Sequence, residues 1–202
     1  IAMTTTDAKS NIRGAVLALM AFALYAMHDV VVKFLGESYD TFQIVFFSVL
    51  LSFPLVILML MRDSTSGTLI PIHPWWSALR TVSVIITGSS AFYAFSVLPL
   101  AEVYAILFAS PLLITVLSIP ILGEKVGLNR WFAVGVGLIG VIVVLRPGTT
   151  VLTLGHLGAL AAAIFGSLAS IIVRKIGREE RSAVLLLYPM MANFVLMAAL
   201  LP

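Results

Sequence analysis

The stretch Gly14–Gly36, GAVLALMAFALYAMHDVVVKFLG, aligns without gaps on Gly155–Gly177, GHLGALAAAIFGSLASIIVRKIG. The offset is 141 positions, and six residues of the first stretch meet identical residues in the second. Lys33 also meets a basic residue, Arg174, and each stretch is followed by a short polar link and a hydroxyl residue that opens a new apolar run. This shared order predicts an internal repeat, and a repeat at a fixed period specifies an architecture.

The composition indicates that lipid surrounds most of the chain. Of the 202 residues, 61% are hydrophobic and 10% are charged, and the mean hydropathy is +1.13. A soluble domain carries about 25% charged residues. The absence of Cys excludes a disulfide framework and a cysteine metal site. The net charge of +3 comes without any basic run interleaved with aromatics, so it indicates cytoplasmic loops and no nucleic-acid partner.

Seven apolar runs approach the length of about 20 residues that spans a bilayer. They are Gly14–Phe34, Phe42–Met61, Trp75–Val97, Leu100–Leu122, Trp131–Leu145, His156–Val173 and Ala183–Leu201. The pair Pro147-Gly148 is expected to end the fifth, because both residue types terminate helices. The pattern predicts an all-α integral membrane protein, built as a polytopic helical bundle.

Lys and Arg in the links predict the orientation of the helices. With the N-terminus in the cytoplasm, the outside segments carry only Lys33 and Arg146. The inside segments carry nine basic residues: Lys9, Arg13, Arg62, Lys125, Arg130, Arg174, Lys175, Arg178 and Arg181. Residues 1–13 are therefore expected to form a cytoplasmic N-terminal tail.

The repeat then takes on a mechanistic meaning. The first copy, residues 14–148, contains five predicted helices, and residues 155–202 contain the first two helices of a second copy. An odd number of helices makes the second copy enter the membrane from the opposite side, which gives the inverted-topology repeat of many secondary transporters. We expect ten helices in the complete architecture, with this chain either a fragment of it or a short natural form.

Six short motifs carry a resemblance to a known family. They are Leu79-Arg80, Phe92-Tyr93-Ala94-Phe95, Pro99-Leu100-Ala101-Glu102, Ser110-Pro111-Leu112, Gly123-Glu124-Lys125 and Arg146-Pro147-Gly148. Together they resemble an EamA-type member of the drug/metabolite transporter superfamily. The resemblance implies a secondary transporter that moves a small organic metabolite across the bacterial inner membrane by alternating access.

The region around Asp29 is similar to one subgroup of that superfamily. Asp29 followed by Val32-Lys33-Phe34-Leu35 resembles bacterial proteins that include S-adenosylmethionine and riboflavin carriers. The second helix departs from the family pattern, because Gln43-Ile44-Val45-Phe46-Phe47 stands where a basic residue is often found. A substrate role that depends on that basic residue is therefore not expected here.

Asp29 and His28 are candidates for proton coupling or substrate contact. An intramembrane carboxylate costs about 3 kcal/mol or more and usually faces a polar cavity or a partner. The alternative for Asp29 is a pair with Lys33 four residues on, since the two share a helix face. His28 points about 100° away from Asp29 around the helix. A histidine titrates near neutral pH, but a single buried one is more often hydrogen-bonded packing.

Glu102 and Arg80 are the other charged candidates within apolar runs. Glu102 is expected at a depth comparable to that of Asp29, so the two carboxylates could share a proton if their helices are neighbours. Its alternative role is a first-turn acid that complements the helix dipole. Arg80 either binds an anionic substrate group at the inner gate or extends to lipid phosphate.

Three tyrosines and two prolines complete the candidates. Tyr25, Tyr93 and Tyr104 could stack on or hydrogen-bond to a flat organic substrate, or they could pack the bundle. Pro54 and Pro111 are predicted kink positions, because proline frees a backbone carbonyl within a helix. Small residues on the sixth helix, namely Gly158, Ala162 and Gly166, are expected to permit close helix packing.

The chain lacks the patterns of an enzyme. Gly135–Gly140 formally matches G-x-G-x-x-G, but it lies within an apolar helix with no preceding strand, so no dinucleotide cofactor is expected. Neither a metal site nor a catalytic set is predicted. The expected partners are the lipid bilayer and a small metabolite, and a homodimer is left open. The alternative function is a non-transporting membrane scaffold or assembly subunit.

Overall fold

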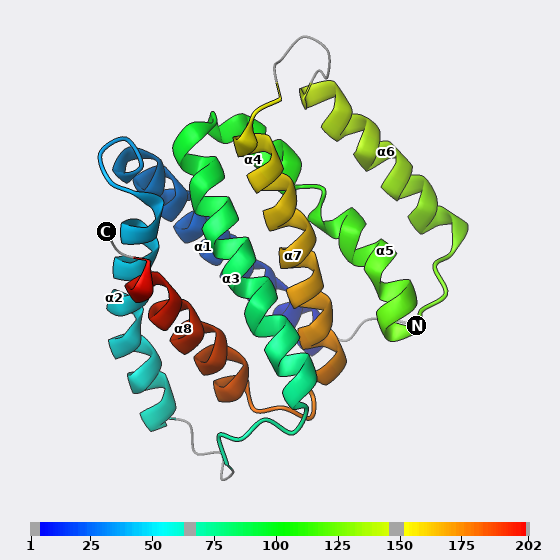
Figure 1. Ribbon diagram of the computed structural model, residues 1–202. Helices are drawn as coiled ribbons and strands as arrows, with labels where there is room; N and C mark the ends of the chain where they lie inside the picture. Colours follow the sequence, from blue (N-terminus) through cyan, green and yellow to red (C-terminus); the bar gives the residue numbers. More distant parts are fainter. Residues whose placement is uncertain (1–4, 63–67, 146–151, 201–202) are drawn as a thin grey trace.

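The computed structural model describes residues 5–62, 68–145 and 152–200 (Figure 1). Over these residues the chain is helical and contains no strand. The helices are α1 (Thr5–Leu35), α2 (Thr41–Arg62), α3 (Pro74–Val97), α4 (Leu100–Leu107), α5 (Ser110–Leu122), α6 (Leu128–Leu145), α7 (Leu154–Ile176) and α8 (Ser182–Ala199). The predicted motif at residues 146–148 lies outside the described part of the chain.

Over the described residues each predicted apolar segment forms one helix, except that the fourth forms two, which confirms a polytopic all-α membrane protein. Six spans are long and apolar enough to cross a membrane, and α4 with α5 counts as one of them. The run Leu128–Val143 of α6 is apolar but shorter. Helix α1 begins at Thr5, within the segment predicted as a tail, while its apolar span is Gly14–Leu35.

The predicted fourth helix is divided at Phe108 and Ala109, just before Pro111. Ala109 N–H donates to the carbonyl of Ile106 at 3.0 Å, a tighter turn than that of an α-helix. Pro111 lies in the first turn of α5, where its missing N–H costs no hydrogen bond. By contrast, α2 continues as one helix through Pro54.

The closest packing in the bundle is between α3 and α7, which lie side by side at its centre (Figure 1). A Cβ added to Gly158 would lie 3.1 Å from the carbonyl oxygen of Ser90, and one added to Gly166 would lie 3.3 Å from Thr87 Cγ2. Ala159 and Ala163 are fully buried on the same helix. This confirms the prediction that small residues on this helix permit close packing.

Several hydroxyl groups on α3 are bonded within their own helix, whereas Ser77 Oγ and Ser89 Oγ are buried and have no hydrogen-bond partner. Ser83 Oγ donates to the carbonyl of Leu79 at 2.8 Å, and Thr87 Oγ1 donates to that of Ser83 at 2.7 Å. Neither hydroxyl leaves its own donor unpaired, and Thr87 is the side chain that Gly166 of α7 approaches.

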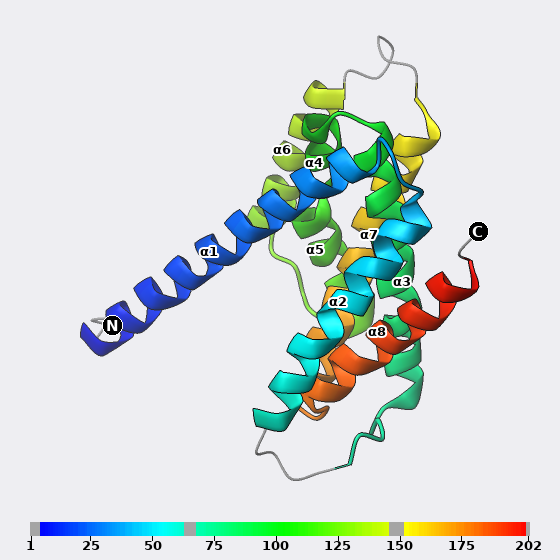
Figure 2. The ribbon, with the colours of Figure 1, turned by 90° about the vertical axis from the view of Figure 1, so that its left-hand side faces the viewer.

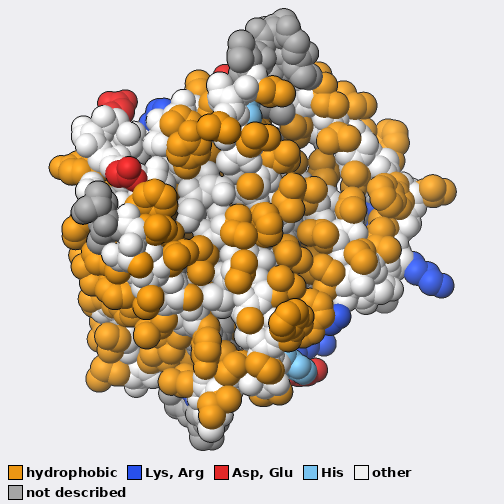
Figure 3. All heavy atoms as spheres, in the orientation of Figure 1, with side chains coloured by type: hydrophobic (Ala, Val, Ile, Leu, Met, Phe, Trp, Pro, Cys, Tyr) orange, Lys and Arg blue, Asp and Glu red, His pale blue; other side chains and the backbone are white. Residues whose placement is uncertain are grey.

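Helix α1 leaves the bundle along most of its length (Figure 2). Leu19 and Phe22 are 72% and 73% exposed, whereas Val32 near its C-terminal end is 2% exposed. Hydrophobic side chains also cover most of the face shown in Figure 3, with charged groups near its edges. Such a surface is suited to lipid or to further apolar helices.

We predict that Gly158→Leu destabilises the protein by about 1–3 kcal/mol, because the larger side chain must separate α7 from α3. The matched control is Gly135→Leu on α6, where an added Cβ meets nothing within 4 Å. Thermal unfolding of both purified variants in detergent measures the difference. Equal losses of stability would contradict the packing role of Gly158.

Candidate functional site

Asp29 is the centre of a polar cluster between α1 and α4. Its Oδ2 accepts a hydrogen bond from Tyr104 Oη at 2.7 Å, and its Oδ1 lies 3.1 Å from His28 Nδ1. The His28 ring meets Phe92 of α3 edge-on at 5.6 Å between centroids. His28 therefore reaches the neighbouring carboxylate, although sequence spacing predicted that it points away. We call His28, Asp29 and Tyr104 the Asp29 cluster.

Lys33 does not pair with Asp29, so the predicted intrahelical ion pair is wrong. Its Nζ donates to the carbonyl oxygens of Ser96 at 3.1 Å and Leu98 at 2.9 Å, where α3 ends. The last carbonyls of a helix have no intrahelical partner and carry the negative end of its dipole. Lys33 satisfies them and leaves the Asp29 carboxylate to Tyr104 and His28.

Glu102 pairs with His156 of α7, so the sequence-based sharing of a site with Asp29 is not what the structure contains. His156 Nε2 lies 3.2 Å from Glu102 Oε2, and the His156 side chain is 9% exposed. His156 Nδ1 also accepts the backbone N–H of Thr153 at 3.1 Å, in a capping box at the start of α7. Because Nδ1 is an acceptor, the neutral ring carries its proton on Nε2, the nitrogen that lies near Glu102.

Arg80 is directed at the backbone of α8. Its guanidinium donates to the carbonyl oxygen of Leu185. Pro189 lies inside α8, four residues after Leu185, and has no N–H to offer that carbonyl. Arg80 therefore replaces a helix hydrogen bond that proline removes, instead of extending to lipid phosphate. Its Nε is buried and has no partner.

Arg80 also lines a cavity of about 290 Å³ between α2, α3 and α8. Polar side chains in its wall include Ser48, Ser52 and Asn193, and Phe92 lies among the apolar ones. Asn193 is 9% exposed, and its Oδ1 has no hydrogen-bond partner. A donor and an acceptor, each buried and unpaired, thus belong to residues that line one cavity.

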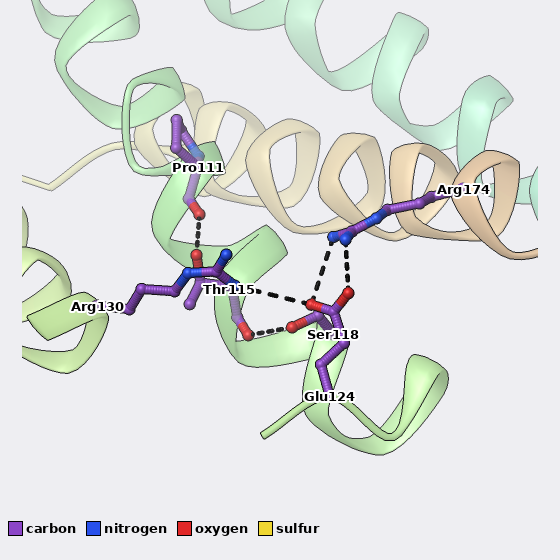
Figure 4. Close-up of polar contacts among 6 residues, drawn as sticks. All are labelled: Pro111, Thr115, Ser118, Glu124, Arg130 and Arg174. Carbon is purple, nitrogen blue, oxygen red and sulfur yellow. Dashed lines mark hydrogen bonds and ion pairs between the residues drawn. The ribbon is translucent and has the colours of Figure 1, made fainter. Parts of the chain in front are cut away.

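At the C-terminal end of α7, opposite the end that carries His156, an ion-pair cluster joins three helices (Figure 4). Glu124, in the link after α5, contacts Arg174 of α7 at 2.5 Å and Arg130 of α6 at 3.8 Å. Gly123, which precedes it, has a φ of 70°, a left-handed conformation that ends α5 at low cost for glycine. The predicted motif Gly123-Glu124-Lys125 therefore turns the chain and holds it to α7.

Tyr25 and Tyr93 lie outside the Asp29 cluster, at 68% and 37% exposure. Three residues of the site were missed by sequence reasoning: His156, Pro189 and Asn193. Thr153 and His156 have the three-residue spacing of a capping box, which is a signal for His156. Pro189 within an apolar run marks a freed carbonyl. Nothing in the sequence singles out Asn193.

Comparison with known proteins identifies the class of protein to which the chain belongs. The model of the EamA-like transporter family matches residues 12–146. The chain belongs to the EamA-like transporter family. No solved structure matches it.

Two curated relatives illustrate the range of names among similar proteins. The chain is 27% identical over 180 residues to the S-adenosylmethionine uptake transporter of Rickettsia prowazekii, covering 89% of this chain and 61% of that protein. It is 31% identical over 114 residues to the riboflavin transporter of Vibrio cholerae, covering 56% of this chain and 38% of that protein. The chain thus spans about three fifths of the first relative's length.

We predict that Asp29→Asn and Tyr104→Phe are energetically coupled. Asp29→Asn removes the charge from the acceptor of the hydrogen bond between α1 and α4, and Tyr104→Phe removes its donor, so the double variant should lose less stability than the sum of the single losses, by about 1 kcal/mol. Chemical unfolding of the four proteins in detergent measures the coupling. Tyr25→Phe is the matched control and should add to Asp29→Asn without coupling.

We also predict that Pro189→Ala relieves the effect of Arg80→Leu. Arg80→Leu leaves the Leu185 carbonyl unpaired and should cost about 1–3 kcal/mol of stability. An alanine at 189 restores the N–H that bonds this carbonyl within α8, so the same Arg80 substitution should cost less in that background. Strictly additive losses would show that Arg80 stabilises the protein in another way.

Proposed function

We propose that the protein is a secondary transporter that moves a small organic metabolite by alternating access. Membership of the EamA-like transporter family and the transporter names of both relatives support this proposal. We further propose that it lies in the bacterial inner membrane with its N-terminus in the cytoplasm. The relative from Rickettsia prowazekii and the excess of basic residues in the links at one end of the bundle support that placement.

The cavity between α2, α3 and α8 is the proposed substrate site. The observation that carries this proposal is the pair of unpaired buried atoms among its lining residues, Arg80 Nε and Asn193 Oδ1. Buried polar groups without partners are costly, and a ligand that supplies both removes the cost. The ligand must offer an acceptor to the guanidinium and a donor to the amide oxygen, as a carboxylate beside an amine or an imide ring does. Phe92 adds an aromatic side chain to the same wall.

The Asp29 cluster is the proposed proton-coupling site. A carboxylate at 15% side-chain exposure, bonded by a tyrosine hydroxyl and an imidazole, has partners on α1 and α4 and contacts α3 through His28. Protonation of Asp29 would turn one acceptor oxygen into a donor and weaken the link between these helices. A proton could in this way bias one arrangement of α1 over another.

The exposed length of α1 fits the proposed inverted repeat of residues 14–148 and 155–202. In the described structure α7 packs along α3, and α1 is the proposed counterpart of α7 in the other copy. The repeat therefore predicts that a helix packs along α1 as α3 packs along α7. That helix would be the counterpart of α3 in the second copy of the repeat, or it would come from a second copy of the chain. Leu19 and Phe22 lie on the surface that such a helix would cover.

The experiment is uptake of radiolabelled S-adenosylmethionine and of riboflavin into proteoliposomes, with and without an imposed pH gradient. We expect the proteoliposomes to take up one of these two compounds, or a compound that competes with one of them, faster with the pH gradient than without it. Asp29→Asn should abolish the response to the gradient. Glu37→Gln, a substitution at an exposed acid in the link after α1, is the matched control. Uptake that ignores the gradient, together with normal transport by Asp29→Asn, would refute proton coupling.

Substrate binding is tested separately through Asn193. Asn193→Ala should weaken binding of the transported compound about tenfold or more, because a site built to hydrogen-bond loses that contact. Ser118→Ala, a change at a buried hydroxyl outside the cavity, should leave binding unchanged. Equal affinities in the two variants would place the substrate elsewhere.

A non-transporting membrane scaffold is the second candidate. The exposed apolar surface of α1 favours it, because a partner protein could cover the same residues. This function predicts a folded protein that neither binds nor moves either compound and that retains a partner subunit through α1.

A further inference from the structure

A second cavity, of about 950 Å³, lies where α2 ends and the chain passes from α7 to α8. From α2 its wall includes Leu55, Leu58 and the terminal residue Arg62. From the link it includes Arg178 and Arg181. The apolar spans of α2 and α7 both finish at this level, so the cavity lies at a membrane–water interface whichever way the protein is oriented.

The two acidic residues in this wall are engaged with His73, just before α3. Glu179 Oε2 lies 2.5 Å from His73 Nε2, and Glu180 Oε1 accepts the His73 backbone N–H at 2.6 Å. Glu180 is 5% exposed. Within the described part of the chain, no acidic side chain forms an ion pair with Arg62 or Arg178. The cavity therefore presents guanidinium groups to an anion, and guanidinium binds phosphate with two parallel hydrogen bonds.

An apolar track leads away from Arg62 along one face of α2. At 100° per residue, its members fall within about 80° of one another around the helix axis. They are Phe47, Leu51, Leu55, Leu58 and finally Arg62. Leu51 and Leu55 are 73% and 70% exposed. From Phe47 to Arg62 the helix rises about 22 Å, which is close to the length of an extended acyl chain.

The geometry points to a binding site for an anionic phospholipid, with its phosphate held by Arg62 and Arg178 and an acyl chain along the Phe47–Leu58 face of α2. The apolar track distinguishes a lipid from free phosphate, which gains nothing from exposed leucines. A net negative headgroup is preferred, because a zwitterionic one brings its own cation to the guanidinium groups. This site is separate from the Arg80 cavity and does not depend on the transport function.

The test is a lipid titration of the detergent-solubilised protein by native mass spectrometry. The ligands are dioleoylphosphatidylglycerol, dioleoylphosphatidylcholine, glycerol 3-phosphate and inorganic phosphate. We expect phosphatidylglycerol to bind more tightly than phosphatidylcholine and far more tightly than the two soluble phosphates. In Arg62→Gln/Arg178→Gln, affinity for phosphatidylglycerol should fall about twenty-fold, since each basic residue near the membrane surface contributes a factor of about five.

Matched variants separate charge, geometry and apolar contact. Arg130→Gln removes an arginine at the same end of the bundle but outside the cavity and should bind lipid as the wild type does. Arg62→Lys/Arg178→Lys keeps the charge and loses the two-pronged geometry, so several-fold weaker binding is expected even if the glutamine variant fails to fold. Leu51→Ser/Leu55→Ser should weaken binding of the lipid and leave glycerol 3-phosphate unaffected. Unchanged phosphatidylglycerol affinity in the arginine variants, or equal binding of inorganic phosphate, would overturn the proposal.

Discussion

Lys33, Lys175 and Arg80 each donate to backbone carbonyls that helix geometry leaves without a partner. Lys33 and Lys175 bond the C-terminal ends of α3 and α5, and Arg80 bonds the carbonyl that Pro189 frees within α8. Arg80 and Leu185 lie within apolar spans, where water cannot satisfy such a carbonyl and a protein side chain must do so. Each of these bonds also ties one helix to another. These bonds therefore help to fix how α1, α7 and α8 meet their neighbours.

The close approach of α3 and α7 is the second constraint. Gly158 and Gly166 bring the two helices together, and the hydroxyls of Ser83 and Thr87 bond within α3. With α3 held in this way, its C-terminal end receives Lys33 and its N-terminal third presents Arg80 to α8. Phe92 of α3 contacts His28 of the Asp29 cluster and also lines the Arg80 cavity, so the two sites adjoin the same side chain.

Sequence reasoning predicted the elements well and their polar partners poorly. Long apolar runs identify helices because each run satisfies its own backbone, and Gly158 and Gly166 indicated close packing for the same local reason. Asp29 and Lys33 show the limit. Their four-residue spacing allowed an ion pair. In the structure Lys33 donates to carbonyls at the end of α3, and Asp29 accepts from a hydroxyl of α4. Neither partner can be predicted from the sequence of α1. Glu102 likewise meets His156, which is distant in the chain.

The sequence by itself determined the spans, the concentration of basic residues at one end, the small-residue face of α7 and the family resemblance. These follow from composition and from spacing along one helix, where geometry is known in advance. The tertiary structure alone decided the division at Phe108, the tautomer of His156, the bond from Arg80 to Leu185 and the neighbours of Asn193. These features depend on which helix packs against which. Helix periodicity predicts which residues share one face of a helix, but not which neighbouring helix that face contacts.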